Sequence, residues 1–450
     1  MTETTETTIA PVWTSHYDSA LLPQRDEPEW MSQLRREAWE IYLDLPVPPP
    51  PQRTLRKIPE LALEGLTAAG SVEDLDAGLA ARIHSWGEAA GVFLEQNGTA
   101  LTRELAEELE AKGVILMSLA EALATHPELV KASLGAVCPA RASKDVALNL
   151  AYWQGGYFLY LPRNIQLELP IYTLQSLLGQ AHVLFQRSLV VVEANSRLTL
   201  IHDSHSLHQD APSLVSDVIE LLIGDNAQVQ VLYLQQWGDD IHCQAYSQAR
   251  LGRDARYTAL NIATGARYHN VYTAVTLDKP GAETTLLGLF AGDDDQHYRQ
   301  TSMQNHLSPH TVSHLQYHSV LRDKAYSFYN GMIYVDRAAQ QTESNQLSKS
   351  LLLSADARAD AIPNLEILAD DVQSGHGAAI GSPDPDQLFY LQSRGFELGL
   401  AENLLVEGFM EEVILQFPDE PLQALIKEHL AMRLLAKDEE REDEREAEGF

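Results

Sequence analysis

Histidines recur at regular spacing in two parts of the sequence, and imidazole is a common metal ligand. One set is spaced by four residues and would line one side of a helix: His306, His310, His314 and His318. Pro309 interrupts this run, however, and its flanks have the pattern of strands and turns, which would not gather four imidazoles into a tetrahedral cluster. The second set lies in a Ser- and Asp-rich loop without helical flanks: His202, His205 and His208. Neither spacing by itself predicts a metal site, and the first set is the better candidate.

Acidic residues form two clusters that could do acid–base chemistry. Asp239-Asp240 and Asp293-Asp294-Asp295 could supply the paired carboxylates of a β-helix enzyme that cleaves polysaccharides. Runs of Asp beside Gly are more often turns. The sequence contains neither the G-x-x-x-x-G-K-[ST] pattern of a P-loop nor the G-x-S-x-G pattern of a serine hydrolase. Enzymatic chemistry in this chain alone is therefore not supported.

The only two cysteines are Cys138 and Cys243. Two thiols exclude a disulfide scaffold. They also exclude a thiolate-ligated iron–sulfur cluster held by this chain alone, because such clusters normally take four thiolates. Cys243, beside His242, is a further candidate metal-binding thiol, although no motif supports it.

Length and charge limit the kind of protein this can be. The chain has 450 residues, with 64 acidic and 32 basic side chains and a formal net charge of −32. This length predicts two or three folded units, and the acidic excess argues against binding to nucleic acid or to anionic membranes. Met1–Ala10 lacks the basic and apolar regions of a signal peptide, and no stretch is long and apolar enough to span a bilayer. We therefore expect a cytoplasmic protein.

The elements that must position these residues change type twice along the chain. Apolar residues from Trp30 to Leu45 recur at spacings of three and four, as in an amphipathic helix. Helical patterns continue in Ser71–Ala90, Thr102–Lys112 and Ser118–Ala132. The centre instead contains short β-prone runs separated by Asn, Asp and Gly, and the helical period returns after Asp384. We expect five parts: a polar, mobile segment 1–26, a mostly helical domain 27–145, a parallel β-helix core 146–384, a helical region 385–436 and a charged tail 437–450.

A recurrent turn supports the β-helix. A turn residue and a small Ala precede several strand-like runs, as in Asp225-Asn226-Ala227 and Arg253-Asp254-Ala255. Small residues at a turn let successive coils stack closely, so that each coil buries its face against its neighbours. The intervals between these turns are irregular, which suits coils whose turns vary in length. A β-sandwich is the alternative architecture.

The segment Pro363–Ala378, PNLEILADDVQSGHGA, is the most distinctive in the chain. It resembles the SufB/SufD family of the iron–sulfur cluster assembly (SUF) machinery, whose SufD form reads P-x-L-E-I-x-A-D-D-V-K-C-S-H-G-A here. Tyr329–Val335 is similar to the family's F-N-G-x-I-x-V, and Ala339–Thr342 to its A-Q-K-T. The resemblance spans roughly Glu29 to Leu435 and is strongest after Tyr329.

The resemblance implies a non-enzymatic scaffold subunit of the SufBCD complex. Its members form a right-handed parallel β-helix flanked by helical regions. They pair with SufB through the β-helix and bind the ATPase SufC through the carboxy-terminal helices. In this chain Leu405, Phe409 and Val413 share one helix face that could enter a partner's groove. A face packed on the chain's own β-helix is the other interpretation.

One departure from the family concerns metal binding. The family's cysteine aligns with Ser374, whose hydroxyl is a poor iron ligand. His376 is therefore the candidate iron or cluster ligand, completed by a partner's thiolate. Otherwise His376 is held by hydrogen bonds in a tight Gly-His-Gly turn. We expect no cofactor bound stably by the chain alone, and at most an iron–sulfur cluster shared transiently with a partner.

Three alternatives stay open. Within the family the chain could be SufB-like, although it lacks the several cysteines expected there. It could instead be a β-helix carbohydrate-active enzyme that uses the Asp pairs. It could also be a self-associating structural protein, because exposed strands can pair edge to edge, and a SufD-like chain purified alone could form a homodimer by that route.

Overall fold

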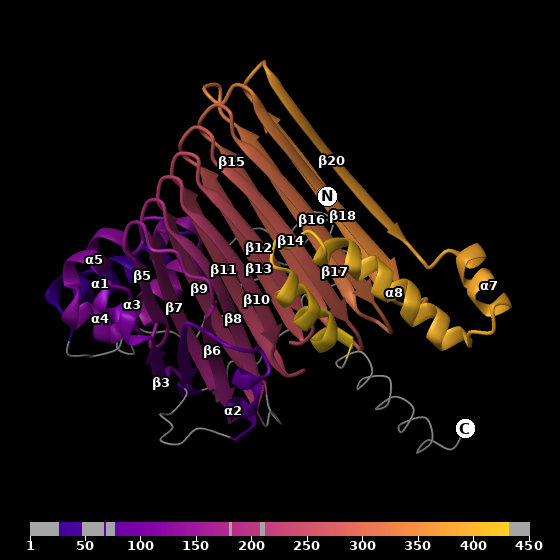
Figure 1. Ribbon diagram of the computed structural model, residues 1–450, viewed down its shortest axis with the longest axis horizontal. Helices are drawn as coiled ribbons and strands as arrows, with labels where there is room; N and C mark the ends of the chain where they lie inside the picture. The colour runs from indigo at the N-terminus through magenta and orange to yellow at the C-terminus, as the bar shows by residue number, and fades with distance from the viewer. Residues whose placement is uncertain (1–26, 47–66, 69–76, 180–181, 208–211, 432–450) are drawn as a thin grey trace, which may run out of the picture.

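The computed structural model describes residues 27–46, 67–68, 77–179, 182–207 and 212–431 (Figure 1). The strands form two ten-stranded sheets, and from the fifth strand onwards successive strands alternate between them; neighbours within each sheet are parallel over nearly the whole length. The result is a parallel β-solenoid of about eight coils with helices at both ends of the chain, as expected from the sequence. The expected segments 1–26 and 437–450 and His208 lie outside the described residues.

From the fifth strand onwards, every second strand belongs to the same sheet. The first sheet contains β1 (Thr67–Ala68), β4 (Ile115–Ser118), β5 (Tyr157–Leu161), β7 (His182–Val192), β9 (Ser213–Ile223), β11 (Ile241–Leu251), β13 (Tyr268–Leu277), β15 (His297–His306), β17 (Tyr326–Val335) and β19 (Arg358–Ile367). The second contains β2 (Gly91–Gln96), β3 (Thr99–Leu105), β6 (Ile171–Leu178), β8 (Arg197–Leu207), β10 (Gln228–Gln236), β12 (Arg256–Ala263), β14 (Glu283–Gly292), β16 (Val312–Leu321), β18 (Thr342–Leu352) and β20 (Val372–Gly381).

The helices flank this core. They are α1 (Glu29–Asp44), α2 (Ala77–His84), α3 (Glu107–Ala111), α4 (Leu119–Thr125), α5 (Pro127–Ser133), the 3-10 turn η2 (Ala140–Ala142), α6 (Lys144–Tyr152), α7 (Pro385–Ser393), α8 (Leu398–Ile414) and a last helix, 420–431. The helical pattern expected over Thr102–Lys112 is found only in α3, because Thr99–Leu105 pairs with β2 as strand β3. No helix within the described ranges is both long and apolar enough to cross a lipid bilayer.

Turns between the two sheets stack on one another. Asn164, Asn195 and Asn226 all have positive φ, between 57° and 64°, a conformation that Asn tolerates better than most residues. The amide of Asn195 donates to Asn164 Oδ1, and that of Asn226 donates to Asn195 Oδ1, both at 3.0 Å. Ala227, which follows Asn226, and Ala255, which follows Asp254 in the next turn, are fully buried. These contacts explain the recurrent turn motif seen in the sequence.

The interior of the solenoid contains both apolar and polar side chains. Apolar residues from successive coils form one continuous cluster that runs from β2 to β17. Towards the far end, hydroxyl and amide groups replace them. Gln300 donates to Ser319 and Ser327, Ser302 bonds to Tyr329 at 2.9 Å, and the Tyr329 hydroxyl donates to Gln346 at 3.0 Å. These mutual hydrogen bonds reduce the desolvation cost of burying the polar groups.

The two ends of the solenoid differ. At the start, β3 and β4 pair antiparallel with β2 and β5, and the N-terminal helices pack alongside. At the far end, β19 and β20 are the last strands of their sheets, and α7 lies beyond them (Figure 1). Helix α8 returns along the outer face of the second sheet, against β14 and β16.

A buried ion pair joins the N-terminal helical region to the first sheet. Arg187 on β7 and Glu220 on β9 are both fully buried, with Nη2 and Oε1 2.6 Å apart. The Glu220 carboxylate also accepts hydrogen bonds from the backbone N–H groups of Gly135, Val137 and Cys138. Arg187 in turn donates to Asn149 on α6 and to the Cys138 carbonyl. We call this set, Asn149, Arg187, Glu220 and residues 135–138, the Arg187–Glu220 clamp.

Candidate functional site

The four regularly spaced histidines are divided between two strands and the turn that joins them. His306 ends β15 inside the solenoid, where it bonds to the hydroxyls of Thr311 (2.7 Å) and Ser313 (2.8 Å). His310 occupies the turn with φ 60°. His314 and His318 lie on β16, and the His318 ring faces outwards and stacks on Phe409. Their placement excludes a stripe on one helix, and the described residues contain no group of three or more His, Cys, Asp or Glu arranged to hold a metal.

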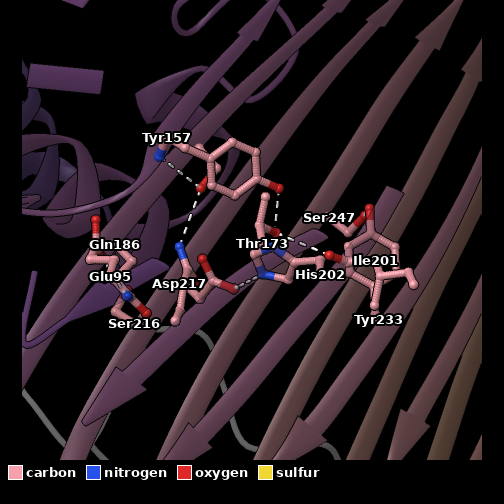
Figure 2. Close-up of polar contacts among 12 residues, drawn as sticks. Glu95, Tyr157, Thr173, Gln186, Ile201, His202, Ser216, Asp217, Tyr233 and Ser247 are labelled. Carbon is pink, nitrogen blue, oxygen red and sulfur yellow. Dashed lines mark hydrogen bonds and ion pairs between the residues drawn. The ribbon is translucent and has the colours of Figure 1, made fainter. Parts of the chain in front are cut away.

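A buried polar network surrounds His202, which sequence spacing had placed with His205 (Figure 2). The Tyr157 hydroxyl lies 3.0 Å from His202 Nδ1, and Asp217 Oδ2 lies 3.1 Å from His202 Nε2. Thr173 contacts the same ring at 3.4 Å. His205 instead bonds to the carbonyl of Gln236. Tyr157, His202 and Asp217 are all buried.

Glu95 extends this polar interior towards the start of the solenoid (Figure 2). Its carboxylate accepts hydrogen bonds from Gln186 Nε2 at 2.7 Å and from the backbone of Gly156 at 2.6 Å. Burial raises the pKa of this carboxyl, and the two hydrogen bonds oppose that shift. Nothing in the sequence indicated that Glu95 is buried, because its neighbours Phe93 and Leu94 are part of an ordinary apolar run.

Three other buried histidines should make stability depend on pH. Burial lowers the pKa of His242 to about 4, of His269 to about 3 and of His306 to about 4. The unfolded chain binds protons near the ordinary value of 6.5, whereas the folded chain does not. The free energy of unfolding should therefore be highest above about pH 6.5 and should fall as the pH drops towards about 4. Urea unfolding at a series of pH values measures this, and His269→Gln should weaken the dependence. An unfolding midpoint that stays constant across this range would contradict it.

The two acidic clusters lie in turns between strands. Gln296 Nε2 donates to Asp239 Oδ1 at 3.0 Å, and Asp295 pairs with Arg267. Asp294 has a positive φ of 46°, as a tight turn requires. These contacts favour turn formation as the role of the clusters.

Both cysteines are buried, and burial raises the pKa of each thiol, that of Cys138 to about 12. Cys243 packs among apolar side chains that include Trp237 and Ile241. Adjacent residues of a strand point to opposite faces, so His242 and Cys243 are directed apart. A high thiol pKa and burial disfavour the thiolate form that metal binding needs.

His376 lies on β20, at the open end of the solenoid. In the register, Ser374 lies beside Ser344 and His376 beside Gln346. Ser344 and Gln346 face the interior, and the hydroxyls of Ser344 and Ser374 are 2.8 Å apart. Because β20 is the last strand, the His376 side chain is exposed. The open end therefore presents an imidazole and a serine hydroxyl next to each other.

The expected partner-binding face of α8 is largely covered by the chain itself. Val413 is fully buried against the second sheet, and Phe409 stacks on His318 with ring centroids 4.3 Å apart. Leu405 is half-buried. Lys349 also anchors the helix, since Nζ lies 2.8 Å from Glu412 and lowers the pKa of that carboxyl. The second interpretation of this face, packing on the chain's own β-helix, describes Val413 and Phe409.

Other apolar side chains near the end of the chain are exposed instead. They lie on α7, in the loop after it and at the start of α8: Phe389, Tyr390, Phe396, Leu398, Leu400 and Leu404. We call these six residues the C-terminal apolar surface. Phe389 is 72% exposed and Tyr390 56%. The periodicity of α8 indicated the buried face, whereas nothing in the pattern distinguished these exposed positions.

Comparison with known proteins places these features in a family. Residues 175–409 match the family described as "SUF system FeS cluster assembly, SufBD core domain", and residues 90–173 match the "SufBD protein N-terminal region". The iron–sulfur cluster assembly protein SufD of Bacillus subtilis is 29% identical over 412 residues, covering 90% of this chain and 94% of that protein. An iron–sulfur cluster assembly SufBD family protein of Pyrococcus horikoshii is 27% identical over 417 residues, covering 89% and 92%. The core-domain match alone covers more than half of the chain, which therefore belongs to the SufBD family of iron–sulfur cluster assembly proteins.

Proposed function

We propose that this chain is a non-enzymatic scaffold subunit of iron–sulfur cluster assembly. In this proposal it pairs with a SufB-like protein through the open end of the solenoid. It binds a SufC-like ATPase through its C-terminal helices. The observation that carries the proposal is the C-terminal apolar surface, which leaves six large apolar side chains exposed on α7, on α8 and in the loop between them.

The C-terminal apolar surface supports a partner-binding role. Contiguous exposed apolar patches on soluble proteins mark interaction sites. The face of α8 that contains Val413 packs on the second sheet, so a partner would meet the opposite side of the same helix. Leu400 and Leu404 lie four residues apart and share one helix side, which is the spacing of anchors in a groove. We therefore assign the ATPase contact to this surface, with Leu405 at its margin.

The open end supports pairing with a SufB-like protein. The outer edges of β19 and β20 offer backbone groups to which another strand can add. Leu365, Leu368 and Ile380 on these last coils are exposed apolar residues. β20 also contains Gly375, Gly377 and Gly381, so little side-chain bulk obstructs an approaching strand.

His376 would then meet the partner at the same end. A neutral imidazole is a good ligand for iron, and a thiolate from the partner would complete the site. In this proposal the cluster is cargo that the two proteins share transiently. Ser374 would act as a hydrogen-bond donor beside it.

Co-purification tests the ATPase contact. We expect the wild-type chain to capture a SufC-like ATPase from the same organism, and a Tyr390→Asp/Leu400→Asp variant to lose that capture at least tenfold, because two anchors are replaced by desolvated charges. Leu43→Asp is the matched control: Leu43 is also exposed, but it lies on α1. Failure of the folded wild type to capture the ATPase would overturn the proposed function. Capture by the double variant would move the contact elsewhere.

A further inference from the structure

Helix α8 is held on the second sheet by a set of polar contacts around His318. The His318 ring is 1% exposed and stacks on Phe409 with an interplanar angle of 21°. Its Nδ1 lies 2.8 Å from the Phe409 carbonyl oxygen, and its Nε2 lies 3.0 Å from Gln316 Nε2. Gln316 also bonds to Glu412 on α8 and to Gln416 just after it. We call these five residues the α8 clasp.

Glu412 fixes the orientation of the Gln316 amide. Gln316 Nε2 donates to Glu412 Oε1 at 3.1 Å, and Gln316 Oε1 accepts from Gln416 Nε2 at 2.8 Å. Lys349 donates to the same carboxylate at 2.8 Å and lowers its pKa, so Glu412 is ionised and only accepts hydrogen bonds. The reverse orientation of the amide would set an oxygen of Gln316 against an oxygen of Glu412. The NH2 group of Gln316 therefore also faces His318.

The two polar contacts of the ring then specify one form of His318. A carbonyl oxygen only accepts, so Nδ1 carries a hydrogen and donates it to Phe409. The amide nitrogen of Gln316 only donates, so Nε2 accepts and carries no hydrogen. Both contacts are satisfied only by the neutral imidazole with its hydrogen on Nδ1. Burial lowers the pKa of His318, in agreement with a neutral ring.

Protonation of Nε2 would break the contact with Gln316. The ring and the amide would then present N–H groups to each other, and the amide could accept from the ring only by turning its oxygen towards Glu412. The charged ring would also have to remain in a buried site, which disfavours charge. We propose that the α8 clasp is acid-sensitive: it holds α8 against the second sheet while His318 is neutral, and it loosens when His318 gains a proton.

Two charged groups of the described chain act on the ring, and they oppose each other. Glu412 on α8 raises the pKa of His318, whereas Lys349 on β18 lowers it. On the other side, His318 lies in register with Leu289 of β14, which has no charge. The other imidazole of β16 is His314, four residues away. Burial is the largest influence on His318 and outweighs the attraction of Glu412.

Hydrogen–deuterium exchange on the full chain tests the clasp at about pH 5 and about pH 7.5, on either side of the ordinary histidine pKa of 6.5. After correction for intrinsic exchange rates, we expect the amides of α8 to open about fivefold more often at the lower pH, the effect of one hydrogen bond. Peptides from β7 and β9, far from α8 in the solenoid, give the opening of the core at each pH. The opening of α8 is compared with theirs, and they also report whether each variant is folded.

Gln316→Glu separates the clasp from a general effect of acid. A carboxylate at this position accepts a hydrogen bond from the protonated ring, so α8 should open less often at pH 5 than at pH 7.5, the reverse of the wild type. His318→Phe keeps a ring on Phe409 and should lose the pH dependence. His314→Gln removes the other imidazole of the same strand and should keep it.

Three results would overturn the proposal. The first is equal opening of α8 at both pH values in the wild type. The second is a pH dependence that persists in His318→Phe. The third is a Gln316→Glu variant in which acid still opens α8, which would show that the amide does not select the neutral ring. None of them bears on the proposed function, since neither the C-terminal apolar surface nor the open end contains His318 or Gln316.

Discussion

Glu220→Ala should destabilise the protein by about 3–5 kcal/mol, because removal of one partner from a buried ion pair leaves an uncompensated charge. Arg187 would remain fully buried without its carboxylate. Three backbone N–H groups, those of Gly135, Val137 and Cys138, would lose their acceptor as well. Urea unfolding followed by circular dichroism measures the loss. Limited proteolysis should cleave residues 135–138 first, since the clamp holds that loop on the first sheet.

Glu283→Ala is the matched control for this change. Glu283 also pairs with an arginine, Arg256, at 3.1 Å, but both side chains are about half exposed. Exposed pairs contribute about 0–1 kcal/mol, so the control should unfold almost as the wild type does. Equal losses in the two variants would show that burial does not govern the contribution of the clamp.

Gly156→Ala should cost more than about 3 kcal/mol, because the position lacks room for a side chain. Its φ is +113°, a conformation that side chains rarely adopt. A Cβ would lie 1.9 Å from the carbonyl oxygen of Arg187, so the first full coil would have to shift. The same shift would disturb the Gly156 N–H bond to Glu95. Thermal unfolding measures the effect as a lowered midpoint.

Gly395→Ala separates the cost of the unfavourable φ from the cost of the steric overlap. Gly395 has a similar φ of +95°, but no atom lies within 4 Å of its added Cβ. Only the backbone strain should remain, at about 1 kcal/mol. If Gly156→Ala is no worse than this control, close packing of β5 against β7 does not matter for stability.

The architecture could be predicted from the sequence because apolar runs and small turn residues recur coil after coil. The full length of the strands could not be predicted from the sequence. β15 contains Gln300, Ser302 and Gln304, three polar residues that face inwards, so no hydrophobic alternation marks it. The side-chain amides of Gln300 and Gln304 donate instead to residues of another strand, Ser319 and Ser313 of β16. A single-strand pattern has no information about those partners.

The candidate sites divide in the same way. His376 could be found because a contiguous motif surrounds it. The network around His202 could not, because Tyr157 and Asp217 are 45 and 15 residues away in the sequence. For α8, the spacing of apolar residues correctly predicted a helix with one apolar face. That spacing does not show whether the face packs on the chain's own sheet or on another protein. Only the position of Val413 against the second sheet resolves the two interpretations for that residue.

The unequal ends of the solenoid limit how large an assembly can grow. Stacked parallel strands resemble a polymer to which units can add at either end, and two reactive ends would permit endless fibres. Here β3 and β4 run antiparallel to the strands they cover, while β19 and β20 end their sheets without such a cover in the described chain. If molecules pair as proposed above, each would have one open end available for pairing. Joining two molecules through their open ends would then use up both ends, so the product would be a closed pair to which no further molecule could add.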